Sequence, residues 1–349
     1  MKVYYSDAHR LHDPLFEVMD GGERAPYLEN PQRMARILST FRKTDWAEIE
    51  EPADFGLAPI LAVHDGGYLK FLASAWSEWM ESNPSGDYSP VHSALLPATF
   101  ALRSQSHIPK SLLGRAGYYI MDLSAVIVEG TYPAALASAN CALSGAQAIT
   151  QNEKAALALC RPPGHHAGRD FAAGYCFINN AAVAANWLTR LGTVAILDID
   201  YHAGNGTQNI FYERSDVFSI SIHADPAFEY PYYAGYADER GLGSGAGYHQ
   251  NFPLPAGVGD AGYLTVLRSG LDLIRKYQPK FVVVSVGMDI YEGDPLGQFN
   301  VTRQGIAEIG RQIQMLNLPM LYVLEGGYNN FQLGENLEAF LNSPNAVKT

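Results

Sequence analysis

The sequence predicts an α/β fold in which helices cover both faces of a mainly parallel sheet. Short runs such as VAILDID (194–200) and FVVVSVG (281–287) are almost continuously apolar, as is typical of strands buried on both faces. Segments with helical periodicity separate these runs from about residue 130 onward, and this alternation favours a parallel sheet. We therefore expect a single domain over residues 1–349, built as three α/β/α layers, with its active site at the carboxyl ends of the strands.

The predicted elements follow in order along the chain. Residues 133–151 form a helix rich in small residues, with Pro133 suited to its first turn, and residues 155–160 form a buried strand. A helix over 177–192 closes on Gly192. The later elements are strands at 194–200 and 217–223, a helix at 260–277, a strand at 281–287, a helix at 303–316, a strand at 320–327 and a last helix to 341.

The first third of the chain has a weaker pattern. Helices are expected over 31–43 and 66–80. Residues 82–116 are rich in Ser, Pro and Gly and show no period, so we expect a long loop near the active-site mouth. A loop of this length inside a compact domain usually has a functional or interface role.

The composition excludes several classes of protein. Apolar residues make up 47% of the chain, which indicates a folded domain, and the net charge of -12 argues against nucleic-acid binding. This charge suits a cationic substrate, although it is also common where it serves solubility alone. Three unpaired cysteines (Cys141, Cys160 and Cys176), no secretory signal and no apolar run long enough to span a membrane favour a cytoplasmic protein.

Polar clusters stand at the carboxyl ends of five predicted strands. They are RPPGHH after the strand at 155–160, the DIDYH segment, His223, Asp289 and Tyr328. Ligands of open α/β sheets bind at this edge, where the loops converge over a crevice. A shared site explains all five clusters together.

The segment Asp198-Ile199-Asp200-Tyr201-His202 predicts a metal site. Alternate side chains of an extended segment share a face, and three such groups at a buried strand end require a cation. With Asp289 from a neighbouring strand, one His and two carboxylates leave an open position, as in catalytic metal sites. Taken alone, the two Asp residues of this segment are equally well explained as turn or helix caps.

The remaining groups fit the hydrolysis of an amide. A metal activates water and polarises a carbonyl, an imidazole of the pair His165 and His166 transfers protons, and the hydroxyl of Tyr328 stabilises an oxyanion. Considered alone, the histidine pair and Tyr328 are better explained as satisfied or packed side chains.

Five motifs together resemble one known family, the arginase-like deacetylases, which comprises histone deacetylases and bacterial acetylpolyamine amidohydrolases. The similarity runs in order over about residues 155–330 and is weaker in AVHDGGYLKFL (62–72). The motifs are RPPGHH (161–166), GYCFINN (174–180), DIDYHAGNGTQ (198–208), GMDIYEGDP (287–295) and EGGY (325–328).

The resemblance implies roles for individual residues. Zinc would be held by Asp200, His202 and Asp289, with Fe²⁺ or Co²⁺ as alternative metals. His166 would be the general base and acid, supported by Asn205, and an amide there keeps the imidazole less easily protonated than a carboxylate does. His165 would be the electrostatic partner oriented by Asp198, and Tyr328 would stabilise the oxyanion.

The resemblance also implies two structural potassium sites and a substrate tunnel. The first potassium would be held by Asp198, Asp200, His202, Ser221 and Ile222, and the second by Phe211, Arg214, Val217 and Tyr248. The tunnel residues would be Gly174, Tyr175, Tyr230 and Gly326.

Two features depart from the family pattern. Ala203 replaces a second His that often follows the zinc-ligand His, and this position is not a ligand. The 82–116 loop matches one that narrows the tunnel across a dimer interface, which implies a homodimer. Acidic residues that read the far ammonium of a polyamine in some members align with Leu113 and Ser124, which are uncharged. The candidate substitutes are Glu81, Asp87, Asp122 and Glu229.

The predicted activity is removal of the acetyl group from a small N-acetylated cationic amine, without nucleic-acid or membrane partners. A deacetylase of protein acetyl-lysine is the alternative, which a narrowed mouth argues against. A non-catalytic sensor of acetylated amines and a two-metal ureohydrolase are weaker alternatives, since every catalytic position is filled and a second metal lacks ligands.

Overall fold

The computed structural model describes residues 1–19, 22–82, 93–102 and 107–342. Its strands are β1 (Lys2–Tyr4), β2 (Glu17–Val18), β3 (Arg24–Ala25), β4 (Glu48–Glu50), β5 (Ala155–Ala158), β6 (Val194–Asp198), β7 (Val217–Ala224), β8 (His249–Leu254), β9 (Phe281–Val286) and β10 (Met320–Leu324). Its α-helices are α1 (Gln32–Phe41), α2 (Ala58–Leu61), α3 (Gly66–Ser82), α4 (Leu112–Tyr119), α5 (Thr131–Thr150), α6 (Asn180–Leu188), α7 (Asn205–Phe211), α8 (Asp260–Tyr277), α9 (Arg303–Gln314) and α10 (Leu333–Leu341).

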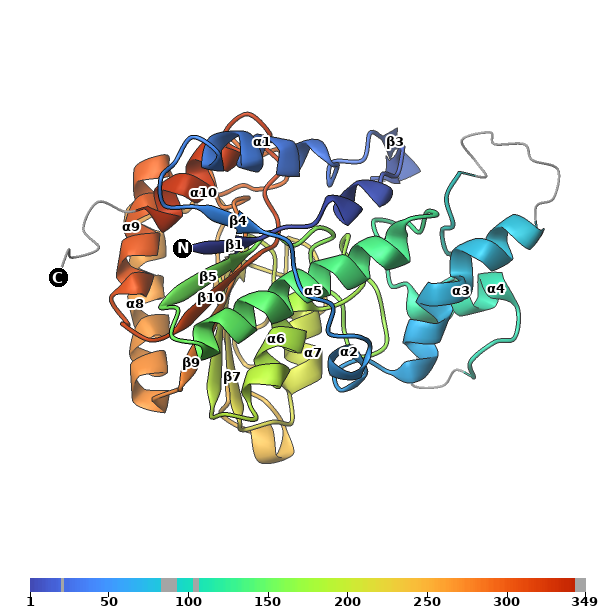
Figure 1. Ribbon diagram of the computed structural model, residues 1–349. Coiled ribbons are helices and arrows are strands. Elements are labelled where there is room, and N and C mark those ends of the chain that lie inside the picture. Colours follow the sequence, from blue (N-terminus) through green and yellow to red (C-terminus); the bar gives the residue numbers. More distant parts are fainter. Residues whose placement is uncertain (20–21, 83–92, 103–106, 343–349) are drawn as a thin grey trace.

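A parallel sheet forms the centre of the molecule. Within the described residues its eight strands run in the order β4-β1-β5-β10-β9-β6-β7-β8, and every neighbouring pair is parallel. Helices α5 and α6 cover one face, and α1, α8, α9 and α10 cover the other (Figure 1). The predicted α/β/α layering with a parallel sheet is therefore confirmed.

The strand sequences explain why both faces need a cover. Along β10, Leu321 and Val323 belong to the hydrophobic core on the α5 side, while Tyr322 and Leu324 belong to the core on the α8 and α9 side. Successive side chains of a strand point to opposite faces, so an apolar run with no polar position buries both. None of the described helices combines the length and apolar character needed to cross a membrane.

The element boundaries differ from the predictions in informative places. The strand predicted over 194–200 ends at Asp198, so the DIDYH segment leaves the sheet after its first residue. The helix predicted over 177–192 begins at Asn180, because the Asn179 side chain caps it by accepting a hydrogen bond from the backbone N–H of Ala182.

Several short elements were not predicted. Strands β1 and β4 have three residues each, too few to show a period, and β8 is an edge strand that contains Pro253. Helix α4 lies largely within the segment 82–116, so the expectation of a continuous loop there is wrong for its last part. Helix α7 begins at Asn205 and carries no apolar stripe in its sequence, NGTQNIF.

Candidate active site

Three potential metal ligands converge beyond the ends of β6 and β9, which are neighbours in the sheet. The Nδ1 atom of His202 lies 3.3 Å from Oδ1 of Asp200 and 3.2 Å from Oδ2 of Asp289. Asp200 and Asp289 are fully buried, and Oδ2 of Asp289 has no hydrogen-bond partner among the described residues. Burial and repulsion from Asp200 raise the pKa of Asp289 to about 7. A cation bound here removes both penalties, so the residues fit a metal.

The adjacent histidines have different partners. Nδ1 of His165 lies 3.1 Å from Oδ2 of Asp198, whereas Nδ1 of His166 lies 2.7 Å from Oδ1 of the neutral Asn205. The two imidazole centroids are 3.9 Å apart. An Nδ1–H that donates to the amide oxygen leaves Nε2 of His166 as the basic atom.

The charges around each ring shift the pKa values of the two histidines in opposite directions. Burial alone would lower the pKa of His165, but Asp200 and Asp198 outweigh it and raise the pKa to about 10. Burial and the neighbouring His165 hold the pKa of His166 well below its ordinary value. His165 is therefore more easily protonated than His166, as a charged helper and a proton acceptor need to be.

A buried carboxylate fixes the backbone of the histidine segment. Oε2 of Glu325 accepts hydrogen bonds from the backbone N–H of Gly164 (2.6 Å) and His165 (3.1 Å). Its Oε1 accepts a hydrogen bond from the Ser285 hydroxyl (3.2 Å). No role was predicted for this Glu of the EGGY motif, although a carboxylate between Leu324 and Gly326, at the end of a buried strand, is a signal in the sequence.

A cavity of about 190 Å³ reaches these groups. His166 and His202 line it together with three residues predicted for the tunnel or the oxyanion, Tyr175, Tyr230 and Tyr328. Gly174 also lines it, and a Cβ there would lie 2.3 Å from Cδ2 of His166, so only glycine allows this approach.

The predicted oxyanion residue is held from two sides. The backbone N–H of Tyr328 donates to Oδ2 of Asp294 (2.7 Å), and the Arg33 guanidinium lies 5.1 Å from the ring centroid. Burial raises the pKa of Tyr328, which keeps its hydroxyl protonated and able to donate. Neither Asp294 nor Arg33 was predicted from the sequence.

Gly326 is not among the described residues that line the cavity. Its backbone N–H donates to Oδ2 of Asp200 (2.8 Å), and a Cβ there would lie 2.3 Å from Oδ2 of Asp289. Gly326 therefore allows the backbone to approach the carboxylates of the metal site.

The residues predicted for the potassium sites come from adjoining elements. Asp198 and Ser221 line a small cavity of about 10 Å³ between β6 and β7, whereas Ile222 follows Ser221 in β7. The residues expected at the second site lie where α7 ends and β7 begins, beside the start of β8; they are Phe211, Arg214, Val217 and Tyr248.

The positions considered for binding the far ammonium group of the substrate lie in different surroundings. Leu113 is exposed on α4, and Ser124 lines the cavity without a charge. Glu229 lines the cavity, whereas Glu81 lies on α3 outside it. Asp87 falls outside the described residues.

Asp122 holds the cavity wall. Its Oδ2 accepts hydrogen bonds from the Tyr230 hydroxyl and the Gly174 N–H, each at 2.7 Å, and its Oδ1 accepts from the N–H groups of Ser124 and Ala125. A further acid in the cavity lining, Glu17 of β2, was not predicted. A two-residue strand gives no periodic signal.

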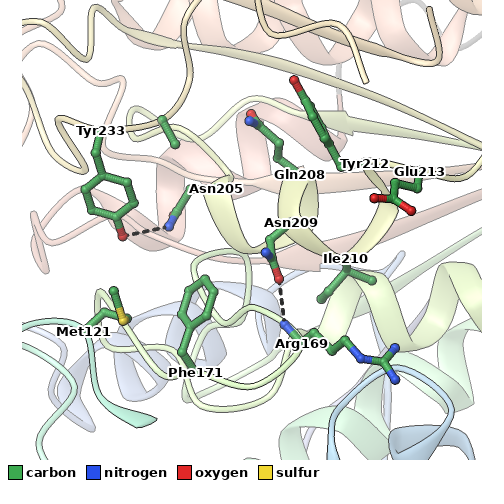
Figure 2. A pocket seen from close by; sticks show the side chains of 11 residues that line it. Met121, Arg169, Phe171, Asn205, Gln208, Asn209, Ile210, Tyr212, Glu213 and Tyr233 are labelled. Carbon is green, nitrogen blue, oxygen red and sulfur yellow. Dashed lines mark hydrogen bonds between the residues drawn. The ribbon is translucent and has the colours of Figure 1, made fainter. Parts of the chain in front are cut away.

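A second cavity, of about 530 Å³, lies on the far side of Asn205 (Figure 2). The Asn205 side chain points toward Tyr233, and its Nδ2 donates to the Tyr233 hydroxyl at 3.3 Å. Since His166 lines the first cavity and Asn205 the second, their hydrogen bond crosses the wall between the two cavities.

Comparisons with known proteins identify the family of this chain. Residues 27–343 match the model of the histone deacetylase domain. The chain is 44% identical to acetylpolyamine amidohydrolase 2 of Pseudomonas aeruginosa over 96% of each chain, and 42% identical to the acetylpolyamine amidohydrolase of Mycoplana ramosa over 97% of each. The crystal structure of acetylpolyamine aminohydrolase from Burkholderia pseudomallei superposes with a TM-score of 0.93 at 39% identity, over 98% of each chain.

Proposed function

This chain belongs to the histone deacetylase family, and we propose that it removes acetyl groups from small N-acetylated cationic amines such as acetylpolyamines and acetyldiamines, releasing acetate. One observation supports this most: Asp200, His202 and Asp289 converge beside a histidine pair at a cavity. No Lys or Arg is among the described residues that line the cavity, which suits a cationic substrate. The relatives named above carry the same activity in their names.

Asp200, His202 and Asp289 would hold one divalent metal, which we propose is zinc, with Fe²⁺ or Co²⁺ as alternatives. The unpartnered Oδ2 of Asp289 supports this proposal. A metal in this position supplies a Lewis acid that polarises the acetyl carbonyl and activates water.

The protein side chains would perform the proton transfers. Nε2 of neutral His166 takes a proton from the attacking water and later gives it to the leaving amine, while Asn205 fixes the orientation of the ring. His165 stays charged beside Asp198 and stabilises negative charge that develops nearby. The Tyr328 hydroxyl donates a hydrogen bond to the developing oxyanion.

Four further proposals depend on the family resemblance. Potassium would occupy the two sites named above, and the small cavity at Asp198 and Ser221 supports the first. The chain would form one domain over residues 1–349 and a homodimer through the 82–116 segment. A reducing, cytoplasmic location is supported by three cysteines that are all free and buried.

The test is a comparison of substrates with purified, metal-loaded protein. N-acetylputrescine and N-acetylcadaverine should be hydrolysed with a higher kcat/KM than an acetyllysine peptide. Faster turnover of the peptide would favour a protein deacetylase and overturn the proposed substrate class. Metal analysis of protein purified without added zinc identifies the native ion.

A further inference from the structure

Glu17 is a buried carboxylate in the cavity that also contains the catalytic candidates. It lies on β2, is 0% exposed, and lines the cavity together with His166, His202 and Tyr328. Among the described lining residues the only other carboxylate belongs to Glu229. Glu17 therefore places a carboxyl group beside the space that the substrate enters.

The carboxylate of Glu17 is held in place but not neutralised. Its Oε1 accepts a hydrogen bond from the backbone N–H of Leu28 (2.9 Å), and its Oε2 accepts one from the Tyr175 hydroxyl. A carboxylate has about four acceptor positions, so these two hydrogen bonds leave two of them unused. Tyr175 itself has a φ of 66°, a left-handed conformation that is uncommon for a bulky residue.

A comparison with Glu29 shows what Glu17 lacks. Glu29 is equally buried, and its Oε1 lies 2.7 Å from Nη1 of Arg33 and 3.0 Å from Nε of Arg161. The part of the chain that the structure describes offers Glu17 no such cation within 4.0 Å. Burial raises the pKa of Glu17, and a cation entering the cavity would offset this penalty.

The other acids near the cavity are less suited to bind an ammonium group. Asp122 already accepts four hydrogen bonds, three of them from residues that line the cavity. Glu229 is half-buried and its Oε1 accepts a hydrogen bond from Gln298, so water and salt screen its charge more than that of Glu17.

We propose that Glu17 determines substrate specificity by binding the free ammonium group of the acetylated amine. Tyr175 positions the carboxylate, and its ring centroid lies 5.6 Å from that of Tyr328. The ammonium is thus bound within the cavity, one aromatic ring away from the proposed oxyanion residue. This inference rests on the proposed deacetylation of cationic amines and names the residue that selects them.

The test compares two substrates of equal length that differ only in charge. N-acetylputrescine carries a free ammonium group, and N-butylacetamide has the same four-carbon chain without it. The measured quantity is the ratio of their kcat/KM values. Glu17→Gln should lower this ratio by about 10- to 100-fold, mainly through the KM of the charged substrate, because a charge-assisted hydrogen bond is lost.

Two controls separate this effect from a general change in charge or folding. Glu213→Gln removes an equal charge from an exposed residue of the second cavity and should leave the ratio unchanged. With wild-type protein, raising NaCl from 0.05 to 0.5 M should change the ratio by less than about threefold, because a buried pair is weakly screened. This second measurement applies even if the Glu17 variant does not fold.

Three results would overturn the inference. The ratio could stay unchanged in Glu17→Gln, or it could collapse with salt, which would assign recognition to a half-buried carboxylate such as Glu229. A wild-type enzyme that hydrolyses neither substrate would overturn the proposed function as well. If wild type prefers N-acetylputrescine and Glu17→Gln keeps the same preference, only the role of Glu17 is overturned.

Discussion

Asn205→Asp tests the proposal that His166 is the general base and His165 the charged helper. The new carboxylate would replace an amide oxygen that lies 2.7 Å from Nδ1 of His166. Unit charges about 4 Å apart interact by about 4 kcal/mol at an effective dielectric of about 20, which corresponds to about 3 pKa units. Because Asn205 is only 4% exposed, burial opposes the new charge, and we expect the pKa of His166 to rise by about 1 to 3 units.

The assay is the pH dependence of kcat/KM for an acetylated diamine, which reports the ionisation of the free enzyme. The base acts in its neutral form, so a higher pKa means that activity is lost at a higher pH. The acidic limb of the profile should move upward by about 1 to 3 pH units. Asn209→Asp, on the same helix but exposed, should move it by less than about 0.3 units. An unmoved limb in Asn205→Asp, or equal shifts in both variants, would refute the assignment of His166 as the base.

Three further predictions concern single side chains. His166→Ala should lower kcat by about 100- to 10,000-fold and His165→Ala by less, because only His166 transfers the proton; steady-state kinetics of both variants check the order, and the reverse order would contradict it. Tyr328→Phe should lower kcat by roughly 100- to 1,000-fold while metal analysis shows unchanged loading; a loss of metal would contradict the oxyanion role. His64 should destabilise the fold in acid, because burial lowers its pKa from 6.5 to about 4. As the pH falls, its imidazole therefore takes up a proton in the unfolded chain before it does so in the folded protein. This stability is fully present above pH 6.5 and falls by up to about 3 kcal/mol toward pH 4, so urea unfolding should show a steeper loss for wild type than for His64→Gln; parallel pH dependences would contradict it.

The placement of the metal-site and histidine residues could be predicted from the sequence, because each of them follows a strand that is recognisable by its apolar run. VAILD and FVVVSV are buried on both faces, so their positions in the sheet are strongly determined, and Asp200 and Asp289 then meet at one edge. The sequence did not show that DIDYH leaves the sheet after Asp198. In the structure Asp198 binds His165, while Asp200 joins His202 and Asp289.

The residues that were missed reach the site through contacts far apart in sequence. Glu17 lies on a two-residue strand and touches Tyr175, which is 158 positions away. Glu325 binds the backbone of Gly164 and His165 across about 160 positions. Neither contact leaves a periodic or spacing signal, since tertiary packing alone brings these segments together.

The central claim is that Asp200, His202 and Asp289 hold the metal on which deacetylation depends. The most direct measurement is acetate release from N-acetylputrescine as metal-stripped protein is titrated with Zn²⁺, in wild type and in Asp289→Asn. We expect that wild-type activity is absent at the start and saturates at one equivalent of metal per chain, whereas Asp289→Asn requires a large excess. Full activity of the stripped protein, or the same titration curve for both proteins, would contradict it.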